Sequence, residues 1–217
     1  IGSMTWLKDG ERYSRLENNK QTGGTDIVAY RAKDNSREVI IPSSLLTDKS
    51  TGRPIPVRSV SWSADNEKVL IYNNTRRVWR YDTRGDYWVL NLKDGALRQL
   101  GKGMPESSMM FAKFSPDGTR VAYVSNNNIY VEDIDSGKIT QLTKDGSDTI
   151  VNGTFDWVYE EEFSCRDGFR WSPDGKYIAY WQSDTEGTGV FDIINNVDSV
   201  YPTILHFPYP KAGTANS

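Results

Sequence analysis

Cysteine and histidine are almost absent from this chain of 217 residues, which contains one of each, Cys165 and His206. A single cysteine excludes an internal disulfide, and one cysteine with one histidine cannot build a tetrahedral zinc site. A Ser-His-Asp triad needs a histidine base, and His206 lies in an apolar stretch where a packed structural imidazole is favoured. We therefore predict no catalytic residue, no metal and no cofactor, while a carboxylate pair of glycosidase type stays open.

Long apolar runs and blocks of one charge sign are also missing. No apolar stretch approaches the roughly 20 residues that a membrane helix needs. The 26 basic and 29 acidic residues are mixed along the chain, and the formal net charge is −3. A phosphate-binding stripe is therefore absent, and we predict that nucleic acid is not a partner. No secretory signal precedes the first aromatic segment, and the compartment of the parent protein stays open between periplasm, secretion and membrane anchoring.

Aromatic residues, in contrast, are plentiful, with seven Trp and twelve Tyr, which favours half-buried sheet surfaces. One aromatic-led pattern recurs. Residues 171–180 (WSPDGKYIAY) closely match residues 114–123 (FSPDGTRVAY), and more divergent copies begin at Trp62 and Trp6. The four starts, near Trp6, Trp62, Phe114 and Trp171, lie 56, 52 and 57 residues apart. This period is typical of propeller blades lengthened by loop insertions.

The chemistry within each repeat agrees with a blade. Ser-Pro-Asp-Gly predicts a turn between strands, and the apolar run after it predicts a strand covered on both faces. The only helical turn we expect is near residues 156–163. The sequence therefore predicts an all-β fold over residues 1–217, a partial β-propeller of about four four-stranded antiparallel blades. Because an open set of blades leaves apolar faces exposed, we expect a larger propeller, with closure of four blades as the alternative.

The long insertion between the third and fourth repeats holds three successive glutamates, Glu160, Glu161 and Glu162, flanked by aromatic residues. Aromatic neighbours would partly desolvate these carboxylates, which is costly for like charges unless a cation is supplied. Such a cluster suits an ammonium group. The competing interpretation is a solvated helical turn with one acid paired to a nearby arginine.

A second segment of interest, residues 73–86, is rich in arginine and aromatic side chains. An arginine fork there could grip a carbonyl or carboxylate group of a ligand. The alternative is a surface hairpin whose arginine stems cover an aromatic ring. The residues concerned are Arg76, Arg77, Arg80 and Arg84, interleaved with Trp79, Tyr81 and Tyr87.

Residues 156–163 (DWVYEEEF) closely resemble the double-glutamate motif in the propeller of dipeptidyl peptidase IV family enzymes. Residues 201–213 resemble the family's segment after the next strands, and the Trp79-Arg80 dipeptide is similar to its substrate-binding arginine segment. In that family an eight-bladed propeller covers an α/β-hydrolase domain, and together they remove dipeptides from peptide N-termini. The resemblance implies that Glu161 and Glu162 hold the substrate's α-ammonium group and that Arg80 reaches a substrate carbonyl.

On this resemblance we expect the substrate-recognition region of a dipeptidyl peptidase IV-like serine exopeptidase, with a peptide N-terminus and a C-terminal hydrolase domain as partners. That domain is expected to be absent here, so the chain alone is predicted to have no peptidase activity. The alternative is a non-enzymatic propeller module that self-associates into a homo-oligomer through exposed blade faces. A third possibility is a sibling family member with different length specificity.

Overall fold

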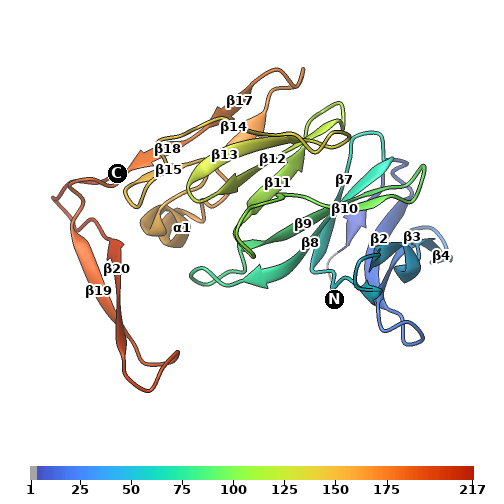
Figure 1. Ribbon diagram of the computed structural model, residues 1–217, viewed down its shortest axis with the longest axis horizontal. Coiled ribbons are helices and arrows are strands. Elements are labelled where there is room, and N and C mark those ends of the chain that lie inside the picture. The colour runs from blue at the N-terminus through green and yellow to red at the C-terminus, as the bar shows by residue number, and fades with distance from the viewer. Residues whose placement is uncertain (1–3) are drawn as a thin grey trace. The chain divides into compact units, whose positions relative to one another are not determined.

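The structure, a computed structural model, describes residues 4–217, and strands dominate it (Figure 1). Apart from one 3-10 turn, η1 (Ser43–Leu46), the only helix in this described range is α1 (Trp157–Phe163). Neither helix has the length or the apolar character that a membrane crossing requires. The chain divides into two compact units, Ile1–Val121 with Glu132–Lys138, and Ala122–Val131 with Ile139–Ser217.

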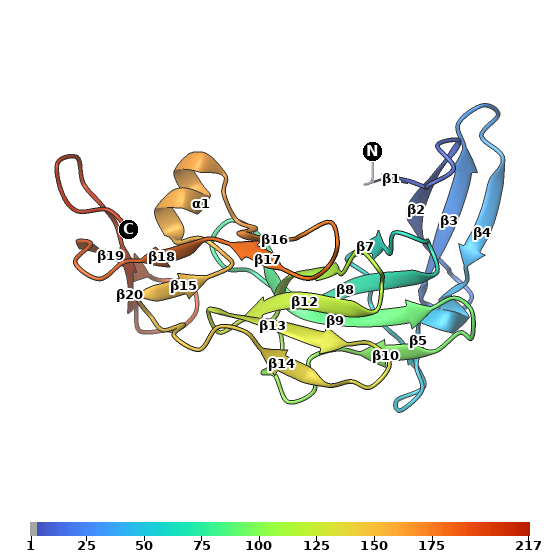
Figure 2. The same cartoon turned by 90° about the horizontal axis from the view of Figure 1, so that it is seen from above.

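The first unit contains two four-stranded antiparallel sheets in which each strand pairs with its neighbour in sequence (Figure 2). The first sheet comprises β1 (Thr5–Trp6), β2 (Arg12–Asn18), β3 (Thr25–Arg31) and β4 (Arg37–Ile41). The second comprises β7 (Ser59–Trp62), β8 (Lys68–Arg76), β9 (Arg84–Asn91) and β10 (Leu97–Gln99). A short pair, β5 (Thr47–Asp48) with β6 (Arg53–Pro54), links them along the chain.

The core of the first unit is made by side chains from both sheets. Its members are fully or almost fully buried, and they are Ile27, Ile41, Leu46, Ile55, Val69, Ile71 and Leu90. Three consecutive residues of β8, Val69, Leu70 and Ile71, are buried, so both faces of this strand are covered. This is the pattern predicted for the apolar strand of a blade, and it explains why the sequence there does not alternate.

A third four-stranded sheet has the order β11 (Met110–Phe114), β12 (Arg120–Ser125), β13 (Asn128–Asp133) and β14 (Ile139–Gln141). The boundary between the two compact units runs through it. Its strand β12 is buried without interruption from Val121 to Ser125. The all-β class and the four-stranded antiparallel sheets predicted from the sequence are thus confirmed.

The rest of the second unit is built from two-stranded sheets. These are β15 (Ile150–Asn152) with β18 (Gln182–Asp184), β16 (Phe169–Trp171) with β17 (Ile178–Tyr180), and β19 (Val190–Asn195) with β20 (Thr203–Pro208). The prediction that the apolar run after the fourth turn is covered on both faces is wrong for this chain. Tyr180 and Trp181 are 45% and 67% exposed, because β17 pairs only with β16 among the described residues.

The turn that opens each repeat has one conformation in all four copies. The amide of its fourth residue donates to the carbonyl of its first at 2.9–3.1 Å, in residues 7–10, 63–66, 115–118 and 172–175. In the last three copies the serine hydroxyl donates to the aspartate two residues later at 2.5–2.6 Å. The Ser115 hydroxyl and the Thr119 amide lower the pKa of Asp117 to about 2. The predicted Ser-Pro-Asp-Gly turn is therefore confirmed.

Candidate substrate-binding site

The predicted helical turn is helix α1, and its own sequence sets both of its ends. Asp156 lies in extended conformation before the helix, and its carboxylate accepts the Tyr159 amide at 3.1 Å, as an N-cap does. Ser164 ends the helix in the left-handed region with φ of 56°. The Cys165 amide then donates to the Tyr159 carbonyl at 3.0 Å. These caps satisfy backbone groups that a seven-residue helix would otherwise leave open.

An aromatic cluster attaches α1 to the β19–β20 hairpin of the same unit. The ring of Trp157 lies 4.9 Å from that of Phe207 and 5.2 Å from that of Tyr209, between centroids. Phe191 contacts the same two rings at 5.9 and 5.5 Å. The helix that carries the glutamates is therefore anchored by ring packing to a hairpin about 50 residues further along the chain.

The three glutamates of α1 differ in their surroundings. Glu160 is buried, Glu161 is half-buried and Glu162 is exposed, as expected when residues advance by about 100° around a helix. Burial raises the pKa of Glu160, the charge of Arg166 opposes that rise, and the charge of Glu161 adds to it. Glu162 therefore lies at the surface, Glu161 is half-buried with its Oε1 atom covered, and Glu160 is buried in the second unit.

The arginine segment is a hairpin that joins β8 and β9 in the first unit. Arg80 lies exposed in the connection, and its carbonyl accepts from the Arg77 guanidinium at 3.3–3.4 Å. The Val78 amide donates to the Tyr81 carbonyl at 3.0 Å, which closes the tip. The Tyr72 hydroxyl donates to the Asp82 carbonyl at 2.8 Å and holds the returning arm against the sheet.

The structure brings Glu161 and Glu162 together on one helix of the second unit. Arg80 lies in the first unit, and its pairing with the two acids around a ligand stays a prediction. A hydrogen-bonded group at the base of the arginine hairpin was not predicted from the sequence. Its members are Asn74, Asp86 and Ser107. An Asn-Asn pair that interrupts an apolar strand was the one signal for them.

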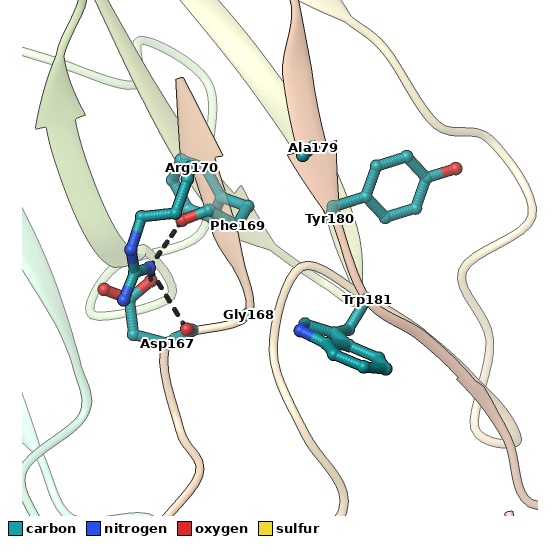
Figure 3. Close-up of a pocket in the computed structure, with 7 residues that line it drawn as sticks. All are labelled: Asp167, Gly168, Phe169, Arg170, Ala179, Tyr180 and Trp181. Atoms are coloured by element: carbon teal, nitrogen blue, oxygen red, sulfur yellow. Dashed lines mark hydrogen bonds and ion pairs between the residues drawn. The ribbon is translucent and has the colours of Figure 1, made fainter. Parts of the chain in front are cut away.

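A separate pocket of about 530 Å³ lies beside the β16–β17 pair of the second unit (Figure 3). Arg170 lines one side of it, and its guanidinium turns back onto Asp167 at 3.0 Å and onto the Phe169 carbonyl at 2.6 Å. Tyr180 and Trp181 line the other side. None of the predicted site residues lines this pocket. Its two charged side chains, Arg170 and Asp167, pair with each other.

The prediction that His206 is a packed structural imidazole is wrong. Its side chain is 65% exposed, and Nδ1 lies 2.6 Å from Asp192 Oδ1 across the β19–β20 pair. The reason is that this hairpin has few neighbours among the described residues, so its apolar composition does not imply burial. Within residues 4–217, His, Cys, Asp and Glu side chains form no group able to hold a metal ion.

Comparison with known proteins decides the family. A family model described as the dipeptidyl peptidase IV (DPP IV) N-terminal region matches residues 63–217. The chain belongs to the dipeptidyl peptidase IV family. It is 34% identical over 241 residues to a probable dipeptidyl-aminopeptidase B of Chaetomium globosum, covering 100% of this chain and 26% of that relative. It is 35% identical over 170 residues to dipeptidyl aminopeptidase B of Saccharomyces cerevisiae, covering 76% of this chain and 20% of the relative.

A solved structure supports the same assignment to the dipeptidyl peptidase IV family. The crystal structure of Porphyromonas gingivalis dipeptidyl peptidase 4 superposes with a TM-score of 0.82 at 27% identity. The match covers 99% of this chain and 30% of that one. The chain therefore spans about a quarter of the length of the curated relatives it matches, and it corresponds to their N-terminal region.

Proposed function

We propose that this chain is the substrate-recognition propeller region of a dipeptidyl peptidase IV-like serine exopeptidase. It binds the free N-terminal amine of a peptide through Glu161 and Glu162, and Arg80 reaches a peptide carbonyl. A hydrolase domain outside this chain cleaves the dipeptide. The observation that supports this most is that α1, in a member of this family, carries two adjacent glutamates of which one is half-buried and one exposed, while the third is buried.

The chemistry of the ligand group fits this arrangement. An α-ammonium group carries one positive charge and three N–H donors, and ionised carboxylates supply only acceptors. Hydrogen bonds between such charged partners are about twice as strong as neutral ones. The half-buried position of Glu161 raises their strength further, because water screens the pair less. Acetylation of the amine removes the positive charge and two of the three N–H donors. It should therefore abolish binding to the two glutamates.

A peptide titration tests the assignment of the two acids. We expect this chain to bind a tripeptide with a free amine, and to bind its N-acetylated form at least tenfold more weakly. Glu161→Gln and Glu162→Gln should each weaken the free-amine peptide about tenfold or more, since each removes one charged partner. Glu186→Gln, an exposed glutamate of the same unit, is the control and should change nothing. Chemical-shift titration measures the affinities. Equal binding of free and acetylated peptide would contradict the proposal.

Catalysis is assigned to another domain, and this can be tested separately. The purified chain should not hydrolyse a fluorogenic Xaa-Pro dipeptide substrate, because its single histidine pairs with Asp192 but has no hydrogen bond to a serine hydroxyl within residues 4–217. Turnover that scales with the concentration of the chain would show that the site assignment is incomplete.

The alternative function, self-association through exposed apolar faces, is supported by a different observation. Large apolar side chains of β19 and β20 stand out from the second unit, and Val190, Ile194 and Ile204 are 66%, 64% and 56% exposed. Light scattering separates the two functions, because a dilute monomer that still prefers the free amine supports recognition alone.

A further inference from the structure

The base of the arginine hairpin has an irregular backbone. The ladder between β8 and β9 shifts its register between Asn73 and Arg76, so Asn74 and Thr75 lie opposite the single residue Gly85. This is a β-bulge, which bends a strand and redirects the segment beyond it. Asn74 has a positive φ of 44°, which is uncommon for a residue other than glycine. The hairpin that carries Arg80 begins at this bend.

A buried carboxylate holds the bend in place. Asp86 on β9 is 7% exposed, and its two oxygens have different partners. Oδ2 accepts from the Asn74 side-chain amide at 2.7 Å, and Oδ1 accepts from the Ser107 backbone amide at 2.8 Å. One side chain therefore joins β9, the bulge of β8 and the connection between β10 and β11.

The same connection returns two further bonds to the bulge. The Ser107 hydroxyl donates to the Asn74 carbonyl at 2.6 Å, and the Asn74 amide group also donates to Glu106 at 2.8 Å. Ser107 itself has a positive φ of 53°. Non-glycine residues in the left-handed region are strained, so Asn74 and Ser107 keep this conformation only where neighbouring groups fix them, and such positions cluster at functional sites.

We propose that Asp86 is a positioning residue that fixes the hairpin over residues 76–84, so that Arg80 is presented to the substrate carbonyl in one orientation. This inference rests on the proposed role of Arg80. Asp86 does not contact the peptide, and it acts through Asn74 and Ser107. Pre-organisation of this kind removes an ordering cost that an otherwise mobile arginine would add on binding.

The direct test is backbone relaxation of the labelled chain without ligand. In the parent chain we expect order parameters near 0.85 for the amides of residues 77–83, and in Asp86→Ala we expect values below about 0.6.

A second variant, Asp86→Asn, keeps an oxygen that can accept from Ser107 but has no second oxygen to accept from Asn74. It should give intermediate order parameters, and it replaces Asp86→Ala if that variant does not fold. Asp94→Ala, an exposed carboxylate in the turn after β9, is the matched control and should leave the hairpin unchanged. Unchanged order parameters in both Asp86 variants would overturn the proposal.

A double-mutant cycle then connects Asp86 to Arg80. With an amino-acid amide as ligand, Asp86→Ala and Arg80→Ala should weaken binding to a similar degree, and the double variant should be no weaker than Arg80→Ala alone. Binding of propylammonium, which has no carbonyl, should be unaffected by either substitution. Additive losses, or equal losses for the two ligands, would overturn the positioning role. If the parent chain does not prefer a free amine over an acetylated one, the proposed function fails, and the order parameters alone then decide whether Asp86 fixes the hairpin.

Discussion

The two segments proposed to bind substrate are held by different kinds of interaction. The arginine hairpin continues two long strands and is fixed at its base by hydrogen bonds to a buried carboxylate, Asp86. Helix α1 has seven residues, and Trp157 attaches it through ring contacts to Phe207 and Tyr209. Polar fixation sets one orientation, whereas ring packing tolerates small shifts.

This difference fits what each segment would recognise. A guanidinium that meets one carbonyl oxygen needs directional hydrogen bonds, so its support has to be rigid. Two carboxylates around an ammonium group attract it over a range of orientations, so a helix held by apolar contacts suffices. The comparison therefore predicts that backbone and polar changes damage the hairpin most, while loss of an aromatic side chain damages the helix most.

The largest effect is expected from Gly85→Ala at the bulge. A Cβ atom there would lie 2.6 Å from the Asn73 carbonyl oxygen and would also overlap the ring of Tyr72. Neither neighbour can move easily, since Asn73 is in the β8 ladder and Tyr72 stacks on Tyr87 at 4.7 Å. We expect the free energy of unfolding to fall by about 3 kcal/mol, as overpacking does. Urea unfolding measures it.

The control for this change is Gly189→Ala. Its added Cβ would meet only the Tyr209 carbonyl oxygen at 3.7 Å, which is ordinary contact, so a change within about 0.5 kcal/mol is expected. If the two substitutions lowered the free energy of unfolding equally, the close contacts at Gly85 would not be the cause of the loss.

A smaller effect is expected from Trp157→Ala on the helix. The substitution removes the contacts with Phe207 and Tyr209, and because Trp157 is half-buried we expect a loss of about 2 kcal/mol. The affinity for a free-amine peptide should fall with it, since Glu161 and Glu162 lose their support. Thermal unfolding and the same peptide titration measure the two losses.

Phe163→Ala is the matched control on the same helix. Phe163 is 67% exposed, and its ring lies 5.7 Å from that of Tyr159 on the same helix, so stability and affinity should change little. If Phe163→Ala weakened peptide binding as much as Trp157→Ala does, the acidic helix would depend on its exposed face and the comparison would fail.

Local chemistry was predictable from the sequence, and long-range partners were not. The repeated turn follows from Ser, Asp and Gly at fixed spacing, as in residues 115–118, and the Asp156 cap follows from an acid ahead of an aromatic helical turn. Both depend on residues within five positions of one another. The sequence also placed the buried apolar strands β8 and β12 correctly, because continuous apolar runs need cover on two faces.

The errors and omissions all involve distant segments. Which glutamate of α1 is buried depends on where Trp157 packs, and its partners Phe207 and Tyr209 are about 50 residues away. The Asp86 group joins residues 12 to 33 positions apart. For His206 and β17 the sequence showed apolar surroundings, yet apolar residues are buried only where another element covers them.

The smallest predicted effect concerns Glu160, and it separates a structural acid from the two ligand-binding ones. Burial raises the pKa of Glu160 above its ordinary value of 4.5, with the charge of Arg166 opposing and that of Glu161 adding. Because the folded-state pKa is the higher one, the contribution of Glu160 to stability is complete below pH 4.5 and is lost as the pH rises through the folded-state pKa. Its Oε1 is also buried without a hydrogen-bond partner in the described chain, which adds to the cost of the ionised form.

Glu160→Gln should therefore stabilise the chain at pH 7 by about 1 kcal/mol at most, and should have no such effect at pH 4. Glu162→Gln, whose side chain is exposed, should change stability at pH 7 by less than about 0.5 kcal/mol while it weakens peptide binding. Urea unfolding from pH 4 to pH 8 measures the first difference, and the peptide titration measures the second. If Glu160→Gln abolished binding of the free amine without changing the pH dependence of stability, the buried acid would itself be a ligand, and the division between one structural glutamate and two binding glutamates would have to be redrawn.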